Sequence, residues 1–266
     1  MWSRCALQIG RQIIAGGTKI KRFDKYPFEV AIIDVKSDIT YCGGMIISSK
    51  FILTAAHCIT KEMAKTKSIC HTRNMPKKCF KPPKTIKIGY INHPTKDVMH
   101  KMEVLRIIPH PHHNAKTYTN DIALIELKTP IVCLDLPRPI CLPAKNLSKV
   151  GNELIIVGWR YSEVEELSGQ SALTEGKVVQ VPSSNCSYIE IPTNRIVCAR
   201  GIKSKQASCQ GNSGSGILIL HDMNYYVLGV TSIGPVNCKS GLPNAYTDVY
   251  ANIDWIKSVV KDLPTI

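Results

Sequence analysis

Short apolar runs separated by turn residues recur along most of the chain. Each run has the length of a β-strand and is rich in β-branched residues. The runs occupy residues 28–35, 43–48, 51–56, 85–91, 103–109, 121–127, 154–159, 176–181, 216–220, 225–233 and 244–250. This rhythm, with little helical periodicity between the runs, predicts an all-β fold built as an antiparallel barrel or sandwich.

The last segment has a different period. Residues 253–263 place apolar side chains at helical spacing, at Ile253, Ile256, Val259, Val260 and Leu263. We therefore predict one terminal amphipathic helix that packs on the body of the protein.

Residues 61–87 interrupt the strand rhythm with a basic segment. Nine of these residues are cationic, namely Lys61, Lys65, Lys67, Arg73, Lys77, Lys78, Lys81, Lys84 and Lys87. We expect a surface loop closed by a Cys70–Cys79 disulfide. No internal repeat and no linker divides the chain, and 266 residues suit one large all-β domain or two small ones.

Eleven cysteines without paired CxxC spacing favour disulfides in an oxidising compartment over zinc sites. Sequons at Asn146 and Asn185 agree with a secreted glycoprotein. Residues 1–12 lack the apolar core of an intact signal peptide, and we interpret them as a propeptide remnant or a truncated N-terminus. No run approaches the roughly 18 apolar residues of a spanning helix, so we expect no membrane association.

The net charge of +14 and the pI near 9.3 indicate affinity for polyanions or acidic proteins, and the basic loop 61–87 is the candidate exosite. The plainer alternative is a solvated loop without a partner. The loop lacks interleaved aromatic residues, so nucleic acid is not expected. Its lysines argue against a calcium site, and we expect no metal and no cofactor.

Three segments carry chemistry. They are Leu53–Cys58 with His57, Asn120–Leu124 with Asp121, and Cys209–Gly216 with Ser213 between glycines. Taken singly, each has an ordinary structural explanation. Together, in the order His, Asp, Ser, they match one known arrangement of the catalytic triad.

From about residue 13 to its end the chain resembles the chymotrypsin/trypsin family of serine peptidases. The resemblance implies two six-stranded antiparallel barrels with the active site in the cleft between them, plus the C-terminal helix. It implies that Ser213 is the nucleophile, His57 the general base and acid, and Asp121 the group that orients the imidazole. The backbone N–H groups of Gly211 and Ser213 would form the oxyanion hole.

The resemblance also assigns the substrate cleft. Ser232 supports the buried aspartate, and the segment from Ser232 to Gly234 would pair with the substrate backbone. Ala207 lies at the floor of the specificity pocket, which disfavours cleavage after Arg or Lys. Asn244 replaces a glycine that usually keeps this pocket open, so we expect small or medium apolar residues before the scissile bond.

The resemblance implies the disulfides Cys42–Cys58, Cys186–Cys198 and Cys209–Cys238. Cys141 matches the family cysteine that tethers the propeptide, which would pair it with Cys5. Cys133 would then be unpaired, would compete for Cys5, or would join another chain.

The chain departs from the family pattern where activation occurs. Asn212 replaces the aspartate that receives the new N-terminus, and Arg160 stands where the family keeps a small glycine. No basic residue directly precedes Ile13 or Ile14. The primary expectation is a secreted endopeptidase that acts on protein or peptide substrates from a zymogen-like state. The alternative is a weakly active or non-catalytic homologue that binds a partner.

Overall fold

The computed structural model describes residues 18–19, 23–92, 98–132, 136–161, 171–187, 191–202, 213–235 and 242–264. Within these residues the chain forms thirteen β-strands. They are β1 (Thr18–Lys19), β2 (Glu29–Asp34), β3 (Thr40–Ile46), β4 (Phe51–Thr54), β5 (Ile86–Ile91), β6 (Met99–Pro109), β7 (Ala123–Leu127), β8 (Glu153–Tyr161), β9 (Ser171–Val181), β10 (Ile196–Gly201), β11 (Gly216–His221), β12 (Asn224–Ile233) and β13 (Asn244–Asp248).

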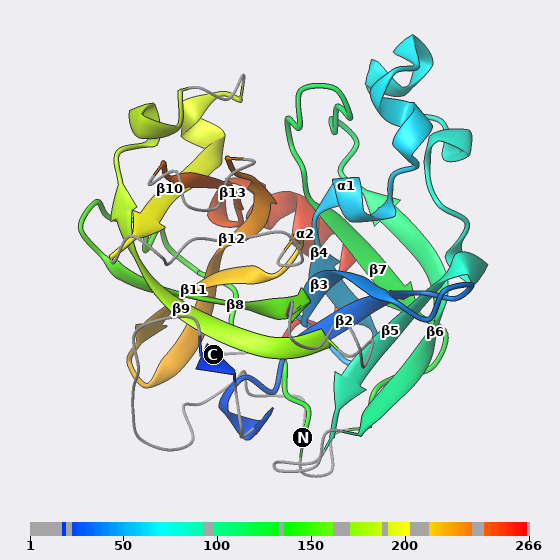
Figure 1. Ribbon diagram of the computed structural model, residues 1–266, viewed down its shortest axis with the longest axis horizontal. Helices are drawn as coiled ribbons and strands as arrows, with labels where there is room; N and C mark the ends of the chain where they lie inside the picture. Colours follow the sequence, from blue (N-terminus) through cyan, green and yellow to red (C-terminus); the bar gives the residue numbers. More distant parts are fainter. Residues whose placement is uncertain are drawn as a thin grey trace.

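Two antiparallel barrels lie side by side (Figure 1). The first closes in the order β2-β3-β4-β7-β6-β5, with β5 returning to β2. The second follows the order β9-β10-β13-β12-β11-β8 and closes through the long β8–β9 pairing, while β1 adds to the outer edge of β9. This confirms the predicted all-β class and its two six-stranded barrels.

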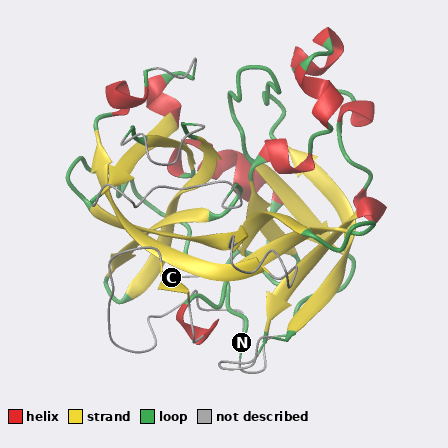
Figure 2. Ribbon diagram, in the orientation of Figure 1, coloured by secondary structure: helices red, strands yellow, loops and turns green. Residues whose placement is uncertain are grey.

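Helical segments are short and lie mainly in the connections (Figure 2). The α-helices of the described chain are α1 (Ala56–Ile59) and α2 (Ile253–Val259). The 3-10 turns are η1 (Phe23–Lys25), η2 (Glu62–Lys65), η3 (Ser68–His71), η4 (Lys77–Cys79), η5 (Pro83–Thr85), η6 (Ser183–Cys186), η7 (Thr193–Arg195) and η8 (Tyr250–Asn252).

The apolar runs located most strands but not all of them. Each of the eleven runs overlaps one strand of the barrels, and β3, β6, β8, β9 and β12 begin before their runs, whereas β10 and the short β1 were not predicted. The terminal helix is shorter than the predicted 253–263. It ends at Val259, because Val260 adopts an extended backbone with φ −97° and ψ 113°.

The basic segment 61–87 forms a loop, as predicted, but one shaped by η2 to η5 rather than irregular throughout. The Cys70–Cys79 disulfide closes it, which confirms the expected staple. At its base the bridge between Thr60 and Phe80 joins the two ends of the loop. Lys61 N–H also donates to Cys79 O at 2.9 Å, and Lys81 N–H donates to Ile59 O at 2.8 Å. The ends of the loop are therefore fixed beside α1.

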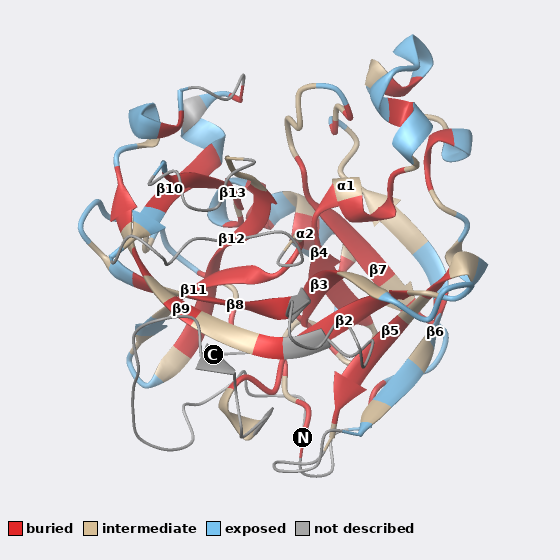
Figure 3. Cartoon of the chain, in the orientation of Figure 1, coloured by how far each residue is buried: buried red, intermediate tan, exposed pale blue. Residues whose placement is uncertain are grey.

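The strands bury their apolar residues in both barrels, and exposed residues gather on the loops and the helical turns (Figure 3). Glu29, on β2, is an exception because its carboxylate is buried in this interior. Among the described residues, neither carboxylate oxygen has a hydrogen-bond partner. Burial raises the pKa of Glu29 well above its ordinary value, and the nearby Gly216 amide and Ser215 hydroxyl oppose this only in part.

In the part of the chain that is described, no helix is long and apolar enough to cross a membrane.

Replacing Glu29 with Gln is expected to raise the free energy of unfolding by an amount that grows with pH. Above pH of about 4.3 the unfolded chain releases the Glu29 proton while the folded chain retains it. The wild type therefore loses up to about 1.4 kcal/mol of stability per pH unit until the folded-state pKa is reached, and Gln does not titrate. Urea unfolding at pH 5 and pH 8, with the disulfides intact, measures the difference.

Glu153→Gln is the matched control, because the Glu153 side chain is 72% exposed. It should change stability little at either pH. A gain from Glu29→Gln that is equal at both pH values would contradict the buried, protonated carboxyl.

Candidate active site

His57 lies on α1, which directly follows β4 of the first barrel. The predicted Cys42–Cys58 disulfide is present and ties α1 to β3. Thr54 Oγ1 donates to Gly43 O at 2.8 Å on the same wall. These links fix the backbone that carries the imidazole.

The Asp121 carboxylate is fully buried and receives three hydrogen bonds. The Nδ1 atom of His57 lies 2.6 Å from Asp121 Oδ2, and the His57 backbone N–H donates to Oδ1 at 2.7 Å. The Ser232 hydroxyl, from β12 of the second barrel, donates to Oδ2 at 2.6 Å. The predicted pairing of His57 with Asp121, and the support from Ser232, are both present.

The electrostatics favour an ionised Asp121. Burial alone would raise its pKa, but the adjacent charge of His57 and the hydrogen bonds from His57 and Ser232 outweigh this and lower the pKa to about 2. An ionised Asp121 accepts the Nδ1 proton of His57, which leaves Nε2 as the free base of the ring. The imidazole thus has the tautomer that proton abstraction requires.

Ser213 lies between the two barrels. Its carbonyl oxygen accepts a hydrogen bond from Gly43 N–H at 2.8 Å, and the next residue, Gly214, donates to Thr231 O at 2.9 Å. Gly214 has a φ of +82°, and a β-carbon there would lie 2.4 Å from Gly43 O. Glycine is required at this position by both its conformation and the close approach of the first barrel.

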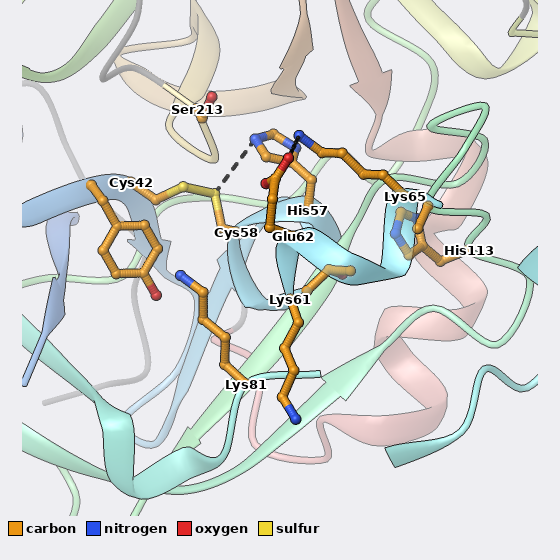
Figure 4. Close-up of a pocket in the computed structure, with 12 residues that line it drawn as sticks. Cys42, His57, Cys58, Lys61, Glu62, Lys65, Lys81, His113 and Ser213 are labelled. Atoms are coloured by element: carbon orange, nitrogen blue, oxygen red, sulfur yellow. Dashed lines mark hydrogen bonds and ion pairs between the residues drawn. A yellow bond between two sulfur atoms is a disulfide. The ribbon is translucent and has the colours of Figure 1, made fainter. Parts of the chain in front are cut away.

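His57 and Ser213 line one cavity of about 310 Å³ (Figure 4). In this structure the two side chains are not hydrogen-bonded to each other, and His57 Nε2 lies 3.8 Å from Cys58 Sγ. Hydrogen bonds between a nucleophile and its base are often long in proteins without substrate, and they shorten when substrate binds. The cavity brings the two groups together without placing them in a reactive contact.

His113 is a buried histidine beside the site that the sequence did not single out. It lines the same cavity, and its ring nitrogens have no hydrogen-bond partner among the described residues. Burial lowers the pKa of His113, so the ring is neutral at neutral pH and adds no positive charge near His57. The sequence around His113 resembles an ordinary loop, so it gave no indication that this side chain is buried.

The predicted substrate-binding residues that the structure describes lie on the second barrel. Ser232 is near the end of β12, Gly234 directly follows that strand, and Asn244 begins β13. Asn244 is buried, and a β-carbon on Gly234 would lie only 1.8 Å from Asn244 Oδ1. The Asn244 side chain therefore occupies the space over Gly234. Ala207, Gly211 and Asn212 lie outside the described residues, as does the side chain of Arg160.

The cysteines agree with the prediction as far as they are described. Cys186–Cys198 is formed, as Cys42–Cys58 is. Cys141 is also disulfide-bonded, and its partner lies outside the described residues, as do the predicted Cys209–Cys238 pair and both Cys5 and Cys133.

One cluster of potential metal ligands overlaps the site. Ligand atoms of Cys42, His57 and Cys58 lie within 4.8 Å of one another. The two sulfur atoms are joined in a disulfide, so neither can act as a thiolate ligand. We do not interpret this cluster as a metal site.

Comparison with known proteins agrees with this geometry. The trypsin family profile matches residues 14–256. The chain belongs to the trypsin family.

The chain is similar to several insect proteins. CLIP domain-containing serine protease B4 of Anopheles gambiae is 30% identical, over 95% of this chain and 71% of that protein. Melanization protease 1 of Drosophila melanogaster is 29% identical, over 98% of this chain and 68% of its own length. Phenoloxidase-activating factor 3 of Holotrichia diomphalia is 27% identical, over 97% of this chain and 75% of its own length.

Proposed function

We propose that this trypsin-family protein is a serine endopeptidase that cleaves protein substrates through an acyl-enzyme. The observation that carries the proposal is the buried, ionised Asp121, which holds Nδ1 of His57 at 2.6 Å in a cavity shared with Ser213. Burying a carboxylate is costly unless it is paired, and here its partners orient one imidazole.

In this mechanism Nε2 of His57 removes the proton of Ser213 Oγ as the oxygen attacks the scissile carbonyl carbon. Asp121 stabilises the imidazolium that results. The N–H groups of Gly211 and Ser213 bind the oxyanion. His57 then gives its proton to the leaving amine, and a water molecule hydrolyses the Ser213 ester by the same route.

We further propose that the protein is zymogen-like. Asn212 cannot neutralise the α-ammonium of a new N-terminus, whereas the aspartate usual in the family can. Without that ion pair the oxyanion hole at Gly211 is less well organised, and removing one partner of a buried pair typically costs about 3–5 kcal/mol.

The proposed setting is extracellular. Three disulfides are fully described, which favours an oxidising compartment. Asn146 and Asn185, the two sequon asparagines, are both exposed and accessible to glycosylation.

Asn212→Asp is expected to raise kcat/KM for peptide hydrolysis about tenfold or more when the chain is prepared with Ile13 as its N-terminus. The new carboxylate can pair with the α-ammonium and organise the oxyanion hole. Fluorogenic peptides with Ala or Val before the scissile bond provide the assay.

Two controls show whether the activity depends on Ser213 and whether the gain depends on a free N-terminus. Ser213→Ala should lower kcat by about 10⁴-fold or more in either background. Acetylating the N-terminus of the Asn212→Asp variant should remove its gain. High activity of the wild type that Asn212→Asp leaves unchanged would refute the zymogen-like state.

The contact between Asn244 and Gly234 leads to a separate expectation about specificity. Asn244→Gly should open the pocket and raise kcat/KM for peptides with Phe or Leu before the scissile bond, relative to Ala, by about tenfold. The ratio of the two kcat/KM values in wild type and variant measures the change. An unchanged ratio would mean that Asn244 does not limit the pocket.

The second candidate function is a weakly active or non-catalytic homologue that binds a polyanion or an acidic protein through loop 61–87. Asn212 favours it, as do Lys77 and Lys78, which are exposed on the stapled loop. Heparin affinity that depends on these two lysines, in a protein whose Ser213 is inert under all activating conditions, would favour it over the endopeptidase.

A further inference from the structure

The basic loop contributes directly to the cavity that holds His57 and Ser213. Lys61, Lys65 and Lys81 all line this cavity, together with Glu62 (Figure 4). The side chains of three lysines and one glutamate therefore contribute to the walls of a space of about 310 Å³ that Ser213 also lines. Such a concentration of charge in a small concave space favours an anionic ligand.

The charges in the cavity are not fully compensated. Glu62 pairs with Lys65, with 3.0 Å between the charged atoms. Within the described part of the chain, no carboxylate forms an ion pair with Lys61 or Lys81. Lys61 and Lys81 are thus the cavity lysines without a carboxylate partner among the described residues.

Lys81 is held in place rather than freely solvated. Its ammonium lies 3.5 Å from the centroid of the Tyr41 ring, and its backbone is bonded to Ile59 at the base of the loop. Burial lowers the pKa of Lys81, and Asp34 and Glu62 oppose this only in part. A partly desolvated cation with a fixed position interacts more strongly with an incoming carboxylate than a mobile surface lysine does.

The position of the cavity identifies the part of the substrate that it receives. Under the proposed function, residues before the scissile bond pair with Ser232 to Gly234 and enter the pocket at Asn244, all on the second barrel. The cavity that Lys61 and Lys81 line lies on the first-barrel side of Ser213. Its walls there are Tyr41, the Cys42–Cys58 disulfide and the base of the loop. A peptide that passes Ser213 in an extended form must continue across this wall.

We propose that Lys61 and Lys81 form a subsite for acidic residues of the substrate, Glu or Asp, in the first positions after the scissile bond. This inference rests on the proposed function and names the class of substrate. The basic loop then acts as one wall of the cleft, and its outer lysines are not required. A peptide carboxylate fits this concave space, whereas a long sulfated polysaccharide needs an extended cationic surface.

Equilibrium binding tests the subsite without requiring turnover. Three fluorescent peptides, identical except for Glu-Glu, Gln-Gln or Lys-Lys after the bond, are titrated with the Ser213→Ala variant by fluorescence anisotropy. The Glu-Glu peptide should bind about tenfold more tightly than Gln-Gln, and the Lys-Lys peptide more weakly still. The preference should decline as the salt concentration rises.

Two double variants show which lysines cause the preference for the Glu-Glu peptide. Lys61→Gln/Lys81→Gln, in the Ser213→Ala background, should remove the preference for Glu-Glu, while Lys77→Gln/Lys78→Gln should retain it. The control pair lies on the same loop, removes the same charge and does not line the cavity. Thermal unfolding of each variant shows whether it is folded.

Equal affinity for the Glu-Glu and Gln-Gln peptides, or no detectable binding of Glu-Glu, would overturn the subsite. An equal loss in both double variants would also overturn it, in favour of diffuse attraction by the loop. If the Glu-Glu preference is present while Ser213 cleaves none of the peptides in either the Asn212 or the Asn212→Asp background, the endopeptidase proposal fails and the subsite stands.

Discussion

The arrangement of the cleft depends on a single buried charge, the carboxylate of Asp121. It lies between the barrels and receives hydrogen bonds from the His57 side chain and backbone and from Ser232. The first barrel provides His57 and the second provides Ser232, so the carboxylate is stabilised only when both barrels are folded and packed together. Thr247 of β13 adds a hydrogen bond to the Asp121 carbonyl at 3.1 Å. The tautomer of His57 thus depends on the packing of the whole molecule.

Two other buried ionisable side chains, Glu29 and His113, also have pKa values set by burial and by the partners available to them. Glu29 is as deeply buried as Asp121 but lacks comparable partners, so its pKa rises where that of Asp121 falls. His113 is buried without a hydrogen-bond partner among the described residues, and it stays neutral. Asp121 therefore places a negative charge beneath His57, whereas Lys61, Lys65 and Lys81 line the cavity at the base of the basic loop.

The strands and the three chemical segments could be predicted because their signals are local. Apolar runs mark eleven strands, and His57, Asp121 and Ser213 each lie in a distinctive short sequence. The strand β10 was missed because its apolar part is brief and ends in Arg200 and Gly201. The contact of Asn244 with Gly234 and that of Lys81 with Tyr41 join residues on different elements. Such contacts depend on how the chain folds back on itself, which spacing along the sequence does not reveal.

We propose that the Asp121–His57 pair makes Ser213 a nucleophile. The most direct test is the reaction of the protein, prepared with Ile13 as its N-terminus, with a fluorophosphonate, followed by intact mass and peptide mapping. We expect one adduct, located on Ser213, which forms much more slowly when Asp121 is replaced by Asn. The absence of any adduct on Ser213, or labelling at the same rate without Asp121, would contradict it.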